Sequence, residues 1–127
     1  MLDLRLLERT GTNKDRRRRP RVFMDLPVEV READGGEIHG GMIVDGSEIG
    51  FLIYSIKEMS MGTRLNLLIL FSNALRFTHL EVLTEIVRKK KRVNEGQTGY
   101  EYGLKIVEIG EKDFRKLKYL LQGNTDT

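Results

Sequence analysis

Apolar and polar residues alternate along most of the chain, in short segments separated by glycine-containing turns. This two-residue period predicts β-strands with one face buried. The predicted strands cover residues 22–30, 38–45, 51–54, 65–71, 75–87 and 100–109. No helical pattern separates them, so we expect about six antiparallel strands closed into a barrel or a sandwich.

Several positions within these segments carry further information. Pro27 lies inside the first predicted strand, where it has no amide hydrogen to donate, so we expect an edge position or a bulge there. Gly40-Gly41 predicts a bulge or a sharp bend in the second strand. Residues 65–71 are almost continuously apolar, which predicts burial on both faces. Ser72-Asn73 and residues 94–97 predict the turns of the last two hairpins.

The C-terminal segment changes to a helical period. Four apolar residues recur at that spacing: Phe114, Leu117, Leu120 and Leu121. Glu111 and Asp113 favour a helix start, and Gly123 is suited to its end. We therefore expect a mainly β domain over residues 16–122 with one C-terminal helix, preceded by a flexible arm (residues 1–15) and followed by a tail (residues 123–127).

Positive charge is concentrated in two places. Half of the 22 Lys and Arg residues lie in residues 14–21 and 88–92, although the formal net charge is only +3. The rest of the chain is therefore acidic. Such focusing favours an anionic partner. The alternative for residues 88–92, which we favour, is a solvated hairpin end.

Composition limits the function classes. The 127 residues suit one domain, and the absence of cysteine excludes disulfides and thiol chemistry. No signal peptide or membrane span is recognisable, which is compatible with the cytoplasm. His39 and His79 show no metal-ligand spacing, and Ser47 lacks a catalytic partner pattern. We therefore expect a binding protein, with no cofactor and no metal, and not an enzyme.

Two segments together suggest a ligand site. The first, Arg16-Arg17-Arg18-Arg19-Pro20-Arg21, is rich in planar cations that grip phosphates and stack on bases. The second, Asp45-Gly46-Ser47-Glu48-Ile49-Gly50, offers a carboxylate and a hydroxyl to base edges. A compact anionic ligand that carries bases fits both.

These segments also match R-x-x-x-R and [D/N]-x-S-x-x-G, in that order and with one predicted hairpin between them. On this basis the chain resembles the PilZ domain, a bacterial receptor module for cyclic di-GMP. Residues 84–88 and 102–106 are similar to the family's last two strands, so the resemblance covers roughly residues 15–121. It implies a six-stranded antiparallel barrel with a C-terminal helix.

The resemblance also implies roles for single residues. Arg17 and Arg21 would hold phosphate and a guanine edge, while Asp45 and Ser47 would contact the guanine and its neighbouring polar groups. Gly50 would permit the turn that aims them. Asp accepts hydrogen bonds from the ring N–H and amino group of guanine, a pattern that adenine does not present.

Neighbouring residues extend this implied site. An arginine at position 16 resembles the family members that bind an intercalated dimer of cyclic di-GMP. Four consecutive arginines leave the register open, so Arg18 or Arg19 would assist. Gly46, like Gly50, allows either a positive φ or a close approach of the backbone to the ligand.

The leading interpretation is thus a cyclic-di-GMP receptor that changes the angle between arm and barrel and signals to a separate partner protein, in motility or biofilm regulation. One alternative is a nucleic-acid-binding barrel that uses residues 14–21 and 88–92, although aromatic residues are not interleaved with these cations. Another is a protein-interaction barrel without a ligand. A cyclic dinucleotide with one adenine is an alternative ligand.

Overall fold

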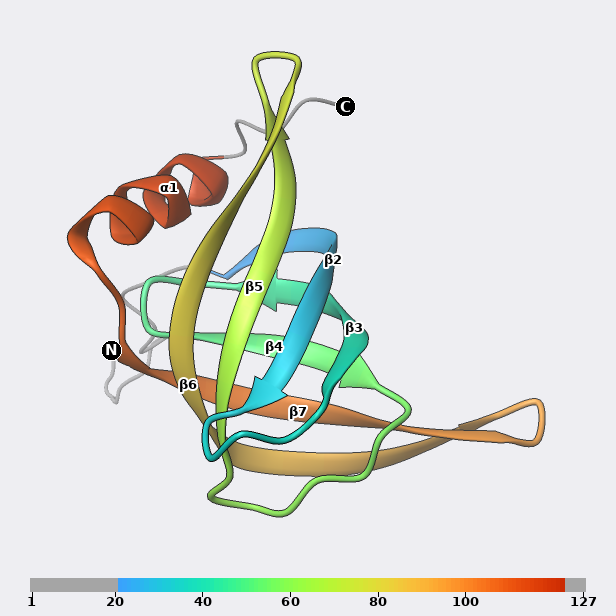
Figure 1. The fold of residues 1–127 in the computed structure, drawn as a ribbon. Helices are drawn as coiled ribbons and strands as arrows, with labels where there is room; N and C mark the ends of the chain where they lie inside the picture. The colour runs from blue at the N-terminus through green and yellow to red at the C-terminus, as the bar shows by residue number, and fades with distance from the viewer. Residues whose placement is uncertain (1–20, 123–127) are drawn as a thin grey trace, which may run out of the picture.

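The computed structural model describes residues 21–122 of the chain (Figure 1). This range forms six strands and one helix, labelled as in the figure: β2 (Val22–Glu32), β3 (Ile38–Gly46), β4 (Gly50–Ser55), β5 (Arg64–Asn73), β6 (Arg76–Asn94), β7 (Gln97–Glu108) and α1 (Glu111–Leu121). The element order and the strand positions confirm the sequence prediction.

The six strands close into an antiparallel barrel. Neighbours follow the order β2–β3–β4–β7–β6–β5, and β5 pairs with β2 to complete the ring. Alternation along each strand turns one side inward. In β5, for example, Leu65, Leu67 and Ile69 are fully buried. Two hairpins extend beyond the ring, β5–β6 at one end and a long β6–β7 ribbon at the side (Figure 1).

The bulge predicted near Pro27 is present in β2. The register with β3 shifts between Phe23 and Leu26, and Asp25 has a φ of 52°. Pairing of β2 with β5 begins only at Val28, so the missing amide of Pro27 interrupts no ladder there. The bulge could therefore be predicted from the missing amide hydrogen of proline alone.

Three local predictions were wrong. The β5–β6 turn is formed by Ala74-Leu75 rather than by Ser72-Asn73, and β5 continues to Asn73. Leu70, outside the barrel, is 36% exposed, so residues 65–71 are not buried on both faces. Gly40-Gly41 continues β3 in regular register. A Cβ on Gly41 would lie 2.9 Å from the Tyr54 carbonyl oxygen, which explains the glycine by close packing.

Helix α1 packs against β6 through its apolar face. Leu117 and Leu120 are buried. Asp113 Oδ1 accepts a hydrogen bond from the Glu81 N–H over 3.2 Å, and Lys116 Nζ donates to the His79 carbonyl over 2.8 Å. These backbone groups lie where β7 no longer pairs with β6. Within the described residues, no helix has the length and hydropathy that a membrane span requires.

Candidate functional site

Arg21 binds Asp45 directly, although the two residues are 24 positions apart. Arg21 Nε donates to Asp45 Oδ1 over 2.7 Å, and Arg21 Nη2 lies 2.6 Å from the same oxygen. The β2–β3 register, which pairs Phe23 with Asp45, brings the two together. Their side chains remain 30% and 24% exposed. An arginine of the first motif and the acid of the second motif are therefore in direct contact at a position that solvent can reach.

Ser47 shapes the β3–β4 turn and is only 1% exposed. Its Oγ accepts a hydrogen bond from the Ile49 N–H over 3.2 Å, and its own N–H donates to the Gly50 carbonyl over 2.9 Å. Serine stabilises many turns in this way. Its contact with a ligand stays a prediction.

The two motif glycines are required by packing. Neither has a positive φ, which excludes one of the two alternatives that the sequence allowed. A Cβ on Gly46 would lie 2.7 Å from a ring carbon of Phe51, and a Cβ on Gly50 would overlap the Leu104 carbonyl oxygen. The glycines thus let the turn sit tightly against the barrel wall, which fixes the position of Asp45.

Four of the predicted site residues, Arg16, Arg17, Arg18 and Arg19, lie outside the described residues. Their predicted roles stay predictions. The placed part of the candidate site is Arg21, Asp45 and the turn that follows.

A row of paired residues leads from Asp45 across the outside of the barrel. Asp45 pairs with Leu52, Leu52 with Gly103, and Gly103 with Arg88. Residues directly opposite each other in antiparallel strands point to the same face. Phe51 and Leu104, their neighbours in sequence, are buried, so this row faces outward.

The far end of the row was missed by the sequence analysis, which treated Arg88 as one of a charge run. A Cβ on Gly103 would lie 2.9 Å from Arg88 Nε, so this guanidinium reaches across the bare backbone of Gly103. Leu52, Val87, Arg88 and Gly103 help to line a hollow of about 470 Å³, which also borders Met61. An apolar floor thus lies between Asp45 and Arg88, whose backbone positions are three strand spacings, or about 14 Å along the sheet, apart. The feature of the sequence that could have indicated this arrangement is Gly103, because a glycine within a strand leaves room for another side chain to cross the backbone.

The remaining cations of residues 88–92 lie along the β6–β7 ribbon, whose tip is exposed as predicted. Lys89 Nζ lies 2.9 Å from Glu58 Oε2, and Arg92 Nη2 lies 3.0 Å from Glu101 Oε1. The hydrogen bond from Lys89 holds the pKa of Glu58 below its usual value, and the same bond raises the pKa of Lys89. These pairings neutralise part of the basic run.

Both histidines lie in strands, as expected. His79 is exposed on β6, while the ring nitrogens of His39 are buried in β3. Residues 21–122 contain no group of three or more His, Asp or Glu side chains arranged to hold a metal ion.

Comparison with known proteins supports this reading of the motifs. The family model of the PilZ domain matches residues 15–123. No curated protein matches the sequence.

Solved structures share the fold. The motility inhibitor MotI (DgrA) of Bacillus subtilis has a TM-score of 0.70 and 17% identity, over 87% of this chain and 51% of that one. This chain thus spans about half of MotI. The PilZ domain of YcgR from Escherichia coli, solved with c-di-GMP, has a TM-score of 0.62 and 14% identity, over 87% and 92%. The PilZ domain of CeSA from a cellulose-synthesising bacterium has a TM-score of 0.58 and 20% identity, over 82% and 96%. With the family model, the motif order and the barrel in agreement, the chain belongs to the PilZ domain family.

Proposed function

We propose that this chain is a receptor for cyclic di-GMP, which binds on the outer face of the barrel beside the β3–β4 turn. The observation that carries the proposal is the direct contact of Arg21 with Asp45. Membership of the PilZ domain family supports it, as does the c-di-GMP bound to the structurally similar domain of YcgR.

The chemistry of the pair suits such a ligand. A carboxylate accepts two hydrogen bonds from the ring N–H and amino group of guanine, while a guanidinium donates two to a phosphate or to the guanine N7/O6 edge. Without ligand, Arg21 and Asp45 neutralise each other. A ligand that carries both phosphate and guanine gives each of the two residues a new partner. A simple anion would bind Arg21 but leave Asp45 without a partner.

The outward-facing row from Asp45 to Arg88 can contact the rest of the ligand. Leu52 presents an apolar surface to a base, and Arg88 supplies a second planar cation that can stack on it or hold phosphate. We infer that Arg88 assists the residues of the two motifs. Arg16 to Arg19 are proposed to close over the ligand from the opposite side, with an intercalated dimer as the larger form of the ligand.

Signalling follows in this proposal from a population shift. If the ligand binds the closed arrangement of arm and barrel more tightly, it favours that arrangement and so alters the surface offered to a partner protein.

Titration calorimetry with cyclic di-GMP tests the proposal. We expect saturable binding near micromolar affinity, about 8 kcal/mol. Arg21→Lys should weaken it about tenfold, because lysine lacks the planar fork, and Asp45→Ala should weaken it at least as much. Arg64 and Glu85 form another exposed ion pair, 3.5 Å apart, so Arg64→Lys is the matched control and should bind normally. Absence of saturation at about 0.1 mM would rule out the receptor function.

A further inference from the structure

Phe23 is an exposed aromatic residue at the edge of the candidate site. Its side chain is 74% exposed, and its partner in β3 is Asp45. Met24, the next residue, packs against the barrel core, so Phe23 faces outward. Directly opposite residues of antiparallel strands point to the same face, with Cβ atoms about 5 Å apart. Phe23 therefore extends the row from Asp45 to Arg88 at the Asp45 end.

The side chains on either side of Asp45 distinguish Phe23 from other exposed apolar residues. Exposure alone says little, because many apolar side chains of folded proteins reach solvent. Asp45 pairs with Phe23 of β2 on one side and with Leu52 of β4 on the other. The acid proposed to bind a guanine edge thus lies between a flat aromatic ring and a branched apolar side chain.

The spacing of these three strands suits a single base. In the ring of strands β3 lies between β2 and β4, so the backbones of β2 and β4 are two strand spacings, or about 9.6 Å, apart. A flat ring with van der Waals contacts on both faces needs about 7 to 8 Å. A guanine that directs its ring N–H and amino group at the Asp45 carboxylate therefore fits between Phe23 and Leu52.

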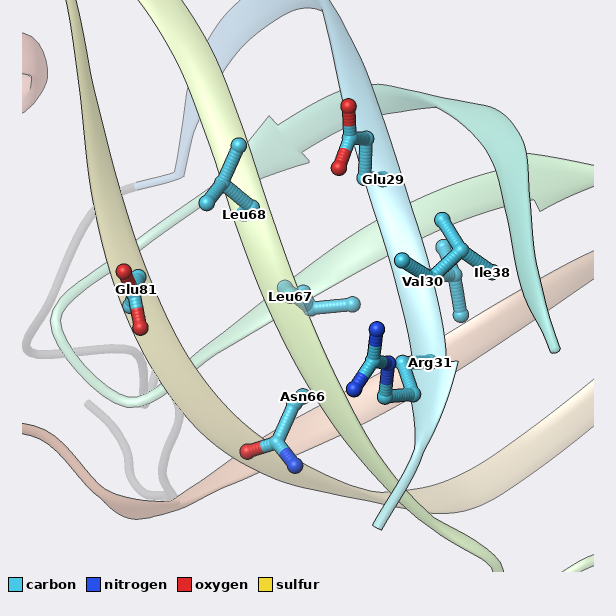
Figure 2. A pocket seen from close by; sticks show the side chains of 8 residues that line it. All are labelled: Glu29, Val30, Arg31, Ile38, Asn66, Leu67, Leu68 and Glu81. Carbon is cyan, nitrogen blue, oxygen red and sulfur yellow. The ribbon is translucent and has the colours of Figure 1, made fainter. Parts of the chain in front are cut away.

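A second hollow on the outside of the barrel lacks this combination. It has a volume of about 360 Å³ and lies over β2, β5 and β6. Glu29 and Glu81 flank Leu68 there, and Arg31 also lines it (Figure 2). Two carboxylates would repel the phosphates of a dinucleotide, and none of the described residues that line this hollow is aromatic. The face beside Phe23 suits a base better.

We propose that Phe23 is a ligand-binding residue, which stacks on the guanine whose edge Asp45 binds. Aromatic rings stack on the flat face of a base, and this contact needs no charge. The stack would hold the base upright on the Asp45 carboxylate, while Leu52 covers its other face. This role depends on the proposed receptor function, and it adds a residue that belongs to neither sequence motif.

Titration calorimetry with cyclic di-GMP is the first test. Phe23→Leu keeps an apolar side chain but removes the flat ring, so the affinity should fall about tenfold, as for one lost base stack. Phe23→Tyr keeps the ring and should bind as the wild type does. Phe77→Leu is the matched control, since Phe77 is a 94% exposed phenylalanine outside the row, and it should also bind normally.

Fluorescence tests the contact itself. The wild-type chain contains no tryptophan, so Phe23→Trp introduces a single indole. Stacking on guanine should quench its emission as cyclic di-GMP is added, whereas the emission of Phe77→Trp should stay constant.

The outcomes separate this role from the receptor function. Wild-type affinity in Phe23→Leu, or an indole at position 23 that the ligand does not quench, would overturn the stacking role and leave the receptor function intact. Absence of binding by the wild-type chain would overturn both.

Discussion

His39 shows how one residue makes stability depend on pH. Its strand partner Val30 is buried, so its ring turns toward the inside of the barrel end. Both ring nitrogens are buried and find no hydrogen-bond partner within residues 21–122. Burial lowers the pKa of His39 below 6.5, and the nearby Lys57 lowers it further, against a smaller opposite effect of Glu32.

We expect acid to weaken the fold through His39. With the folded-state pKa lowered, the unfolded chain binds more protons below about pH 6.5, so stability falls as the pH drops through that value. Thermal unfolding followed by circular dichroism between pH 8 and pH 5 should show this fall, and His39→Leu should flatten it. His79→Gln, at the exposed second histidine, should keep the wild-type slope. Equal slopes in wild type and His39→Leu would contradict the assignment.

At the scale of elements, the spacing of apolar residues was enough to predict every described strand and the helix, because a strand buried on one face repeats every two residues and a helix about every 3.6. It failed where backbone shape is set by contacts. Ala74-Leu75 has no turn chemistry, so Ser72-Asn73 was the natural but wrong choice.

The same limit held for the candidate site. The order of the motifs was enough to predict that Arg21 and Asp45 converge. The row that ends at Arg88 could not be predicted, because the register shift between Ile86 and Arg88 changes which side chains face out, and five successive cations hide that shift.

One side chain from β7 bonds two backbone groups of the loop between β4 and β5. The Tyr102 hydroxyl donates to the Lys57 carbonyl over 2.7 Å and accepts from the Met59 N–H over 2.7 Å. Tyr102 is fully buried, and burial raises the pKa of its phenol. This hydroxyl therefore helps to hold the loop against the barrel, together with the backbone bonds that Gly62 and Thr63 make with Ile86.

Tyr102→Phe should destabilise the protein by about 2 kcal/mol, since a buried N–H of Met59 and a partly buried carbonyl of Lys57 lose their partner. Urea unfolding should show a lower midpoint. Tyr119→Phe removes the same atom from the half-buried tyrosine of α1 and should cost less than half as much. A midpoint unchanged by Tyr102→Phe would mean that water replaces the hydroxyl.

At the scale of the whole molecule, the candidate site belongs to several strands at once. The row from Asp45 to Arg88 crosses β3, β4, β7 and β6, which are consecutive members of the closed ring. A ligand bound across them would stabilise the entire barrel, because the strands cannot separate while it stays bound.

Cyclic di-GMP at 100 times its Kd should therefore stabilise the chain by about 2.7 kcal/mol, seen as a raised Tm. Gly103→Ala should reduce this shift by displacing Arg88, whose flexible end can move without unfolding the ligand-free protein. Gly40→Ala is the control, because a Cβ there meets nothing within 4 Å. A full shift in Gly103→Ala would remove Arg88 from the proposed site.

The two bonds from α1 to β6 have a consequence for misassembly. The His79 carbonyl and the Glu81 N–H are the kind of unpaired backbone groups that recruit a strand from another molecule, and Lys116 and Asp113 occupy them. Helix α1 therefore hinders the addition of a further strand to this edge of β6, and it also buries apolar residues. Substitutions that displace α1 should first cause aggregation during expression, even where the barrel itself still folds.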